Sequence, residues 1–316
     1  MSTALDLKKR QFPSVFDNTG REDWHRCPKK FEYRIVRGLQ DLNKSVDLHA
    51  GGALAAGLEK TRRVFFEQGQ SSREAVDAGV VEVYRFYGEF KCPVNSTKTA
   101  GKMAGALISY FDHYKLGIDP FEPLVDGIEH RFQLRLSIDH PQTGEKMFYG
   151  GRFDLLAADR TNKEVWVVDE KSTKADYRIG SVSEAWLGQW ELDSQMTGYI
   201  WAAKQLMVRL GLDPNRVQGA RVRGIAIGKA GYDHVEVIVK RQDWELDRWY
   251  EEMMEDVKEA VQAEQNRSFR LALGHACHPY GSPCEFAKLC AARDPERLIE
   301  GNYRQEFWLP AAKERR

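Results

Sequence analysis

The stretch Tyr149–Asp176, YGGRFDLLAADRTNKEVWVVDEKSTKAD, decides the fold of this chain. Two segments rich in apolar, β-branched and aromatic residues flank the polar run 160–163, and this pattern predicts a β-hairpin. If residue 159 pairs with residue 164 across that loop, Asp154 lies directly opposite Asp169. The sequence therefore predicts two carboxylates facing each other at the open end of the hairpin.

The opposed carboxylates predict a site for a divalent cation. Two ionised carboxylates repel across a strand ladder, and a cation between them makes the arrangement favourable. Mg²⁺ accepts one or two carboxylates, a carbonyl and several waters, so the backbone carbonyl of Glu170 is a further expected ligand. Lys171 lies two residues after Asp169 and shares its face of the strand. We expect Lys171 to orient water or to stabilise charge on a phosphate.

An ordinary hairpin with a solvated face is the alternative interpretation, because acidic and basic residues at period two are common on such faces. The continuous apolar run 165–168 argues against it. Such a run is typical of a strand buried on both faces, where unpaired charges are costly.

The rest of the chain predicts an α/β (α+β) protein with a central mixed β-sheet flanked by helices. The expected helices are 50–68, 72–90, 101–117, 181–210 and 241–267, with a turn and helix over 14–38. The expected strands are 124–139, 146–158, 164–171, 218–228 and 233–239. We expect a helical N-terminal part (1–123), a sheet core (124–240) and a C-terminal helix with a Cys-rich segment (241–316), all in one compact domain.

Length and composition narrow the class of protein. The 316 residues are 42% hydrophobic and 30% charged, as in a globular enzyme, and the 47 basic and 47 acidic residues cancel. A uniformly basic nucleic-acid binder is excluded, whereas a local basic surface is not. No run approaches the ~18 apolar residues of a membrane span, and the N-terminus has no secretion signal. We therefore expect a cytoplasmic protein that does not contact a membrane.

The hairpin resembles the signature of the PD-(D/E)XK nuclease superfamily, specifically its RecB-like branch. The matching segments are Gly151-Arg-Phe-Asp154 and Val167-Val168-Asp169-Glu170-Lys171. The resemblance implies a restriction-endonuclease-like core in 124–240. It also implies that Asp154 and Asp169 bind metal and that Lys171 serves catalysis.

A second motif of the same branch is Gln-x-x-x-Tyr on the following helix. This chain has Gln195-Met-Thr-Gly-Tyr199, and positions i and i+4 share one helix face. The resemblance implies that Gln195 and Tyr199 belong to the catalytic site and project toward a DNA end. Taken without the resemblance, they would be interpreted as surface and core residues.

Three further residues are candidate metal ligands. Relatives often begin the strand before the hairpin with an acid, which is Glu129 here; a structural role is the alternative. Relatives also carry a metal-binding His within a segment that corresponds to 51–59, but Ala55 occupies that position. His49 or Glu59 would have to substitute, although a lone His near a helix start is commonly a capping or surface residue. The number of catalytic metals is left open.

Three of the five cysteines, Cys277, Cys284 and Cys290, lie within fourteen residues near the C-terminus. Structural disulfides are not expected in a chain without a secretion signal. Thiolates select iron–sulfur clusters or Zn²⁺, and a closed site needs four ligands. The fourth ligand would be Cys27 or Cys92.

The surroundings of Cys27, Cys-Pro-Lys-Lys-Phe-x-Tyr, resemble the upstream ligand of iron–sulfur RecB-like nucleases, such as AddB-type nuclease domains and CRISPR-adaptation nucleases. Phe286 matches the aromatic residue after their middle tail cysteine, although six residues rather than two separate Cys277 from Cys284. The resemblance implies a [4Fe–4S] cluster on Cys27, Cys277, Cys284 and Cys290, with Cys92 a free or buried thiol.

Zinc and unligated cysteines are the alternatives to the cluster, and the lack of a Cys-x-x-Cys knuckle argues against zinc. A cluster that joins residues 27 and 277 would close nearly the whole chain into a loop. Closing so long a loop is expected to contribute much to stability through chain entropy, which favours a structural role for the cluster. Redox sensing is the alternative role.

The resemblance implies a Mg²⁺- or Mn²⁺-dependent deoxyribonuclease, an exonuclease that acts on DNA ends or single strands in recombination or repair. No phosphate-binding Gly-x-x-x-x-Gly-Lys-[Ser/Thr] motif is present, so a helicase would act in trans. A strand-annealing recombinase is the other expected partner, and a phage origin would place the protein in the host cytosol. A non-cleaving, cluster-stabilised nucleic-acid-binding subunit and an endonuclease are the alternatives.

Overall fold

The computed structural model describes residues 9–42, 45–93, 96–176, 178–279 and 283–310. The chain divides into two compact units. The first unit takes its described residues from Met1–Lys44, Phe132–Gly151 and Asp247–Ala312, and the second from Ser45–Arg131 and Arg152–Leu246. The junctions at 131/132, 151/152 and 246/247 lie inside secondary-structure elements, because segments distant in the sequence pack together in each unit. The three segments inferred from the sequence remain a prediction.

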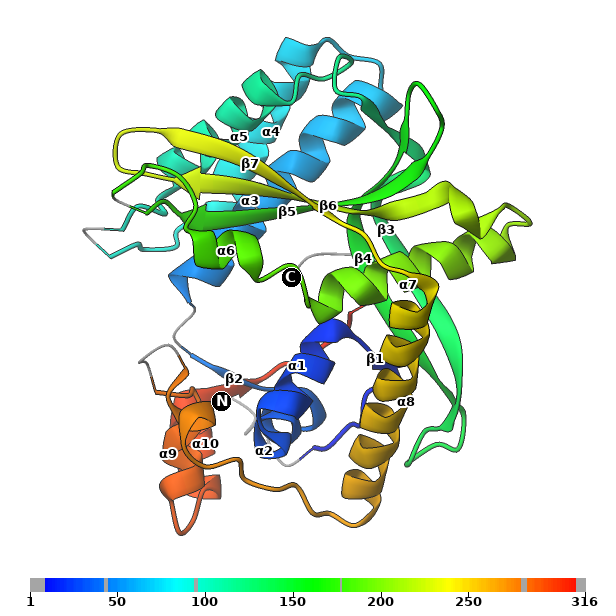
Figure 1. Ribbon diagram of the computed structural model, residues 1–316. Coiled ribbons are helices and arrows are strands. Elements are labelled where there is room, and N and C mark those ends of the chain that lie inside the picture. Colours follow the sequence, from blue (N-terminus) through cyan, green and yellow to red (C-terminus); the bar gives the residue numbers. More distant parts are fainter. Residues whose placement is uncertain (1–8, 43–44, 94–95, 177, 280–282, 311–316) are drawn as a thin grey trace. The chain divides into compact units, whose positions relative to one another are not determined.

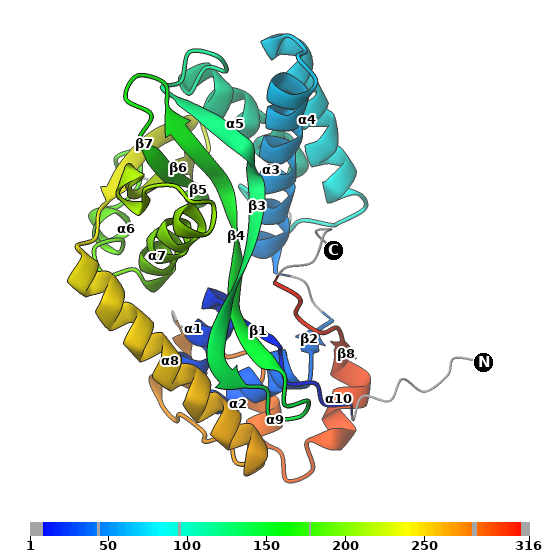
Figure 2. The ribbon, with the colours of Figure 1, turned by 90° about the vertical axis from the view of Figure 1, so that its right-hand side faces the viewer.

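The second unit contains a mixed sheet built on the hairpin. Strand β4 (Lys146–Asp159) is antiparallel to β5 (Val165–Lys174), which is parallel to β6 (Val217–Ile227), which is antiparallel to β7 (Tyr232–Val239). Strand β3 (Phe121–Asp139) pairs with β4, and Figure 2 shows the two side by side. Residues 132–151 of these two strands and their loop belong to the first unit. The predicted fold class, a mixed sheet flanked by helices, is confirmed.

The hairpin register is the one expected from the sequence. Leu155 pairs with Val168 and Ala158 with Val165, so continuing the ladder by one residue places Asp154 opposite Asp169. Residues 165–168 are all buried, as expected of a strand covered on both faces. The alternative of a hairpin with a solvated face is therefore wrong.

Helices cover both faces of this sheet. Figure 1 shows α3 (Val46–Arg62), α4 (Ser72–Tyr87) and α5 (Ala100–His113) on one face, and α6 (Glu184–Gly188) and α7 (Ser194–Arg209) on the other. The first three share a core with Ile225 and Ile227 of β6. The helix expected over 181–210 is two helices, because the Asp193 side chain accepts a hydrogen bond from the Met196 N–H and starts a new helix there.

The first unit joins the beginning and the end of the described chain. It contains β1 (Val15–Phe16), α1 (Asn18–Arg26), α2 (Pro28–Phe31), β2 (Leu39–Asp41), most of α8 (Asp243–Gln265), α9 (Ala287–Ala291), α10 (Glu296–Asn302) and β8 (Tyr303–Gln305). Strand β2 is antiparallel to β8, and Figure 2 shows them together.

The helix expected within 14–38 is interrupted at Cys27, which has an extended backbone. Pro28 then opens α2, since proline has no N–H to donate and is tolerated in the first helical turn. None of the helices in the described ranges is long and apolar enough to cross a lipid bilayer.

Close packing of α3 on α4 yields a stability prediction. A Cβ atom added at Gly79 would lie 1.9 Å from the Thr61 hydroxyl and 2.8 Å from the Gly57 carbonyl oxygen. We expect Gly79→Ala to lower the free energy of unfolding by about 1–3 kcal/mol, because the two helices must separate. The matched variant Gly101→Ala, whose Cβ meets only the Tyr84 hydroxyl at 3.7 Å, should be neutral or slightly stabilising. Equal urea midpoints for the two variants would contradict this account of the helix contact.

Candidate functional site

A cavity of about 430 Å³ in the second unit lies beside the open end of the β4–β5 hairpin. Its walls come from α3 between Asp47 and Leu58, from Lys98 before α5, from β3, and from the adjoining segments of β4 and β5. Its charged lining residues are Asp47, Lys98, Glu129, Arg152, Asp154, Glu170 and Lys171.

The two carboxylates expected at the hairpin end have different surroundings. Asp154 Oδ2 accepts a hydrogen bond from the Glu170 N–H at 3.0 Å, and its side chain is half-buried. Asp169 is 2% exposed, and its Oδ2 lies 2.8 Å from Lys171 Nζ. Burial raises the pKa of Asp169 to about 7; Lys171 opposes this shift and Asp154 adds to it. The pair therefore repels when both acids are ionised.

Lys171 connects the acids to the motif on α7. Its Nζ donates to Gln195 Oε1 at 3.1 Å, and Gln195 Nε2 donates to the Tyr199 hydroxyl at 3.1 Å. That hydroxyl in turn donates to the carbonyl of Arg152 at 2.9 Å. Burial disfavours the charge on Lys171, but Asp169 and then Asp154 outweigh it, so the pKa of Lys171 is raised. The structure thus brings together the residues of both sequence motifs.

The Glu170 side chain points to the other face of β5, into a buried charged network. It forms an ion pair with Arg62 and accepts a hydrogen bond from Tyr110 at 2.8 Å. Arg223 donates to Tyr110 at 3.2 Å and forms an ion pair with Asp119 at 2.7 Å. Burial, followed by the charge of Glu170, raises the pKa of Tyr110. The Glu170 side chain is therefore committed to this network, and only its backbone carbonyl is a candidate ligand.

Of the three additional candidate ligands, only Glu129 lines the cavity. Its carboxylate is buried and lies 2.6 Å from Arg152 Nε. His49 instead contacts the Tyr87 carbonyl through Nε2 at 3.2 Å and stacks on Phe90 with ring centroids 4.0 Å apart.

Glu59 is likewise directed elsewhere, because it forms an ion pair with Arg63 at 3.0 Å. Ala55 itself lines the cavity, so the α3 wall presents a methyl group where the family pattern has a His. The structure therefore does not bring His49 or Glu59 to the carboxylate pair.

The four cysteines expected to bind a cluster all belong to the first unit, whereas Cys92 belongs to the second. Cys27 is buried and its Sγ accepts a hydrogen bond from the Ala272 N–H at 3.4 Å. Cys277 Sγ donates to the Ala272 carbonyl at 3.7 Å, and the Cys284 N–H donates to the Cys277 carbonyl at 2.7 Å. Residues 270–272 thus lie against Cys27, and the Ala272 backbone contacts the sulfurs of both Cys27 and Cys277.

The cysteines of the first unit are close enough to influence one another electrostatically. Burial, followed by the charges that the other three would carry, raises the pKa of the Cys290 thiol to about 11. Burial also raises the pKa of Cys284. Cys284 and Cys290 pack against an apolar cluster that includes Phe286, which is fully buried between Tyr33 and Tyr303. Cys92, in contrast, contacts the Tyr87 hydroxyl at 2.9 Å.

The donor atoms of the two groups favour different metals. Within the described ranges, no group of three or more His, Cys, Asp or Glu side chains is arranged to hold a single metal ion. Two carboxylates and a carbonyl nevertheless fit a hard cation such as Mg²⁺ or Mn²⁺, which fills its other positions with water. A cubane cluster binds one thiolate per iron, so its four sulfurs surround a cluster and need not converge on one point.

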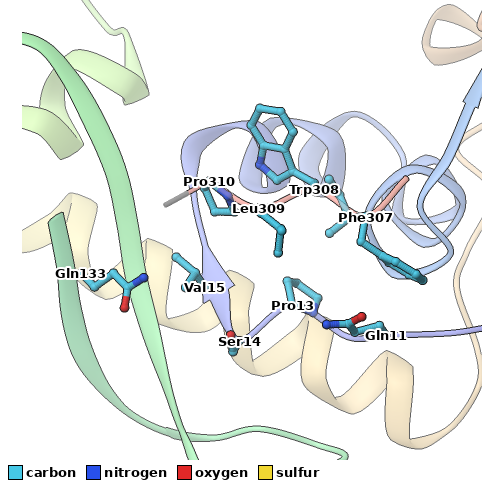
Figure 3. Close-up of a pocket in the computed structure, with 10 residues that line it drawn as sticks. Gln11, Pro13, Ser14, Val15, Gln133, Phe307, Trp308, Leu309 and Pro310 are labelled. Carbon is cyan, nitrogen blue, oxygen red and sulfur yellow. The ribbon is translucent and has the colours of Figure 1, made fainter. Parts of the chain in front are cut away.

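A second cavity, of about 240 Å³, lies in the first unit. Figure 3 shows Trp308, Leu309 and Pro310 on one side of it and Gln11, Pro13 and Gln133 around the rest. Its lining residues include no acid, thiol or histidine, so it lacks groups for acid–base or metal chemistry.

Two features of the site were not anticipated from the sequence. One is the Glu129–Arg152 ion pair, and the other is the network of Glu170 with Arg62 and Arg223. The only sequence signal for the first is that Arg152 lies two residues before Asp154 on the same strand. The second joins residues more than 50 positions apart, for which the sequence has no local pattern.

Comparison with known proteins relates this geometry to a family. The model of the PD-(D/E)XK nuclease superfamily matches residues 19–291. The solved structure of a candidate exonuclease from Eubacterium rectale is 14% identical, and the match covers 89% of this chain and 90% of that chain with a TM-score of 0.50. At this identity the likeness concerns the fold alone.

The structure of SSO0001 is 13% identical, with 64% of this chain and 73% of that chain covered, and its TM-score of 0.25 carries no argument. No curated protein matches the chain significantly.

The raised pKa of Asp169 predicts a pH-dependent stability without metal. An acid with an ordinary pKa near 3.9 when unfolded and about 7 when folded destabilises the fold progressively as pH rises between these values. We expect Asp169→Asn to abolish this loss. Its melting temperature in chelator, relative to the parent, should therefore be higher at pH 8 than at pH 5. The same measurement on Asp112→Asn, at an exposed position of α5, should show no such change. A constant difference for Asp169→Asn would contradict the buried-acid assignment.

Proposed function

Because the chain belongs to the PD-(D/E)XK nuclease superfamily, we propose that it is a divalent-metal-dependent deoxyribonuclease. Membership implies hydrolysis of a phosphodiester bond, with DNA as the substrate and a divalent metal as the usual cofactor. The more specific proposal is an exonuclease that acts on DNA ends or single strands in recombination or repair. The observation that carries it is the placement of Asp154, Asp169 and Lys171 at one end of the hairpin.

In this proposal, Asp154, Asp169 and the carbonyl of Glu170 hold the cation. When bound, the cation supplies positive charge that polarises the phosphodiester and activates water. Binding is favourable because a cation relieves the repulsion between two acids, one of which is nearly inaccessible to solvent. The hydrogen bond from the Glu170 N–H to Asp154 Oδ2 holds the Asp154 carboxylate beside β5.

Lys171 is the residue proposed to act on the substrate. Its ammonium stays charged because two carboxylates surround it, and it can stabilise negative charge on the phosphate or orient the attacking water. Gln195 and Tyr199 are proposed to position it. The two hydrogen bonds from Lys171 through Gln195 to Tyr199 tie the ammonium to α7, so its position does not depend on Asp169 alone.

Exonuclease activity and membership of the RecB-like branch rest on the Gln195/Tyr199 motif. The fold likeness to the Eubacterium rectale protein, which is described as a candidate exonuclease, supports the same proposal. A strand-annealing recombinase or a helicase acting in trans is the proposed partner, and a phage gene the proposed origin.

We further propose a [4Fe–4S] cluster on Cys27, Cys277, Cys284 and Cys290. Thiols that are buried together resist ionisation, and a cationic cluster would offset that cost as a divalent metal offsets the carboxylate repulsion. The N–H of Ala272 that points at Cys27 is the kind of donor that stabilises a cluster thiolate. The cluster would reinforce the β2–β8 pairing, which already joins the two ends of the described chain.

The activity prediction uses a conservative change. Asp154→Asn keeps an oxygen that can accept from the Glu170 N–H but removes the charge that holds the cation. Linear DNA should be degraded by the parent with Mg²⁺ or Mn²⁺ and not in chelator. The variant should cleave at least about 10²- to 10³-fold more slowly, while its melting temperature stays unchanged or rises. End-labelled linear and circular DNA would measure rate and mode together.

Asp112→Asn is the control for this experiment, because that acid lies at an exposed position of α5 and does not line the cavity. Undiminished cleavage by Asp154→Asn would contradict the carboxylate assignment. Cleavage of the circular substrate at the same rate would indicate an endonuclease. Metal-dependent binding without product would support the non-cleaving alternative.

The cluster prediction compares two cysteines. Protein purified without oxygen should be brown and contain about four iron and four acid-labile sulfide per chain. Cys277→Ser should lose both and melt at a lower temperature, because the link between the segments around Cys27 and Cys277 opens. Cys92→Ser, which alters a thiol of the other unit, should keep iron and colour. Colourless parent protein with stoichiometric zinc, or loss of iron from Cys92→Ser, would refute this ligand set.

A further inference from the structure

Arg152 is the cationic residue of the cavity nearest in sequence to Asp154. It lies two residues earlier on β4, and both line the cavity together with Lys171. Its side chain is 23% exposed, so it is accessible from the cavity although it lies in an ion pair. Its carbonyl also accepts the hydrogen bond of Tyr199 at 2.9 Å. Arg152 therefore contacts the site through both its backbone and its side chain.

Glu129 holds the Arg152 guanidinium in place. The carboxylate of Glu129 is 3% exposed and lies 2.6 Å from Arg152 Nε. The Glu129 backbone has φ 51°, a left-handed value that is unusual for a residue with a large side chain. Such strain persists where surrounding structure over-determines it, and it concentrates at functional sites. Here the strained backbone directs a buried acid at an arginine on the cavity wall.

The charges around the cavity explain why a substrate phosphate would need this arginine. Asp154 and Asp169 repel any phosphate that enters. Lys98 is already paired with Asp47 at 2.9 Å, and Arg62 with Glu170 on the other face of β5. Among the cations that line the cavity, Lys171 and Arg152 have more exposed side chains, 31% and 23%, than Lys98, with 12%. A guanidinium with a fixed plane recognises phosphate oxygens better than a flexible ammonium does.

We infer that Arg152 contacts a phosphate of the DNA strand bound in the cavity and that Glu129 positions Arg152 for this contact. The inference rests on the proposed nuclease function, and it assigns to Glu129 a positioning role in place of metal binding. The buried Glu129 carboxylate balances the charge of the Arg152 guanidinium. The guanidinium can therefore stay on the cavity wall when no DNA is bound.

The first test compares Arg152→Gln with Arg152→Lys. Binding of a single-stranded oligonucleotide is measured with Ca²⁺ in place of Mg²⁺ over a range of salt concentrations. Arg152→Gln should weaken binding and raise KM about 10- to 100-fold. The slope of log K against log salt should become shallower by about 0.7, the value for one phosphate contact on a single strand. Arg152→Lys should keep the slope and lose only part of the affinity.

The second test separates positioning from metal binding by Glu129. Glu129→Gln removes the ion pair but keeps the charge of Arg152. It should therefore raise KM by less than Arg152→Gln does and lower kcat, while the affinity for Mn²⁺, titrated without DNA, stays unchanged. Its effects on KM and kcat should be largely absent when Arg152 is already Gln, because the two residues act as one unit. A tenfold weaker Mn²⁺ affinity in Glu129→Gln would mean that Glu129 is a metal ligand and would overturn its positioning role.

The Glu82–Arg85 ion pair on α4, whose arginine is 73% exposed, supplies matched controls outside the cavity. Glu82→Gln and Arg85→Gln should match the parent in KM, kcat and salt slope, and circular dichroism checks that every variant is folded. Unchanged KM and salt slope in folded Arg152→Gln would overturn the inference. A parent protein that binds DNA without cleaving it would contradict the nuclease proposal, and the binding slope would still decide the role of Arg152.

Discussion

Two carboxylates held against each other at the open end of a buried hairpin are the constraint on which the second unit depends. Asp169 is almost inaccessible to solvent, and Asp154 faces it across the ladder. Each acid alone would be an ordinary strand residue; together they make a position where a cation is favoured. The neighbouring basic side chains have distinct surroundings, since Lys171 contacts Asp169 directly, whereas Arg152 is paired with its own buried acid.

The other face of the same strand shows how the backbone is held in place. Glu170 alternates with Asp169 and Lys171 and is bound by Arg62 and Tyr110 from the helices above the sheet. Buried ion pairs contribute little net stability, but breaking one leaves an uncompensated charge. The Glu170 side chain therefore anchors β5 to these helices. Its two neighbours in the strand, Asp169 and Lys171, face the site. The Glu170 carboxylate is thereby unavailable as a metal ligand.

The first unit brings together softer donor atoms. Burial, followed by the charges of neighbouring cysteines, raises the pKa of Cys290, and the Ala272 backbone contacts the sulfurs of Cys27 and Cys277. In both units, groups that carry like charge when ionised lie near one another, so a positive partner would stabilise their ionised forms. A divalent cation and an iron–sulfur cluster are the partners that we propose for the oxygen and the sulfur group respectively.

The sequence by itself determined the hairpin, its register and the fold class, because a four-residue loop between apolar runs leaves one pairing that buries them. Tertiary structure decided the rest. The stacking of the His49 ring on Phe90 directs it away from the carboxylate pair, and the ion pair with Arg152 occupies the Glu129 carboxylate. Both contacts depend on tertiary packing. A period-two pattern states which face a side chain occupies. It cannot state which residue from a distant segment meets it there, since that depends on how helices and strands pack.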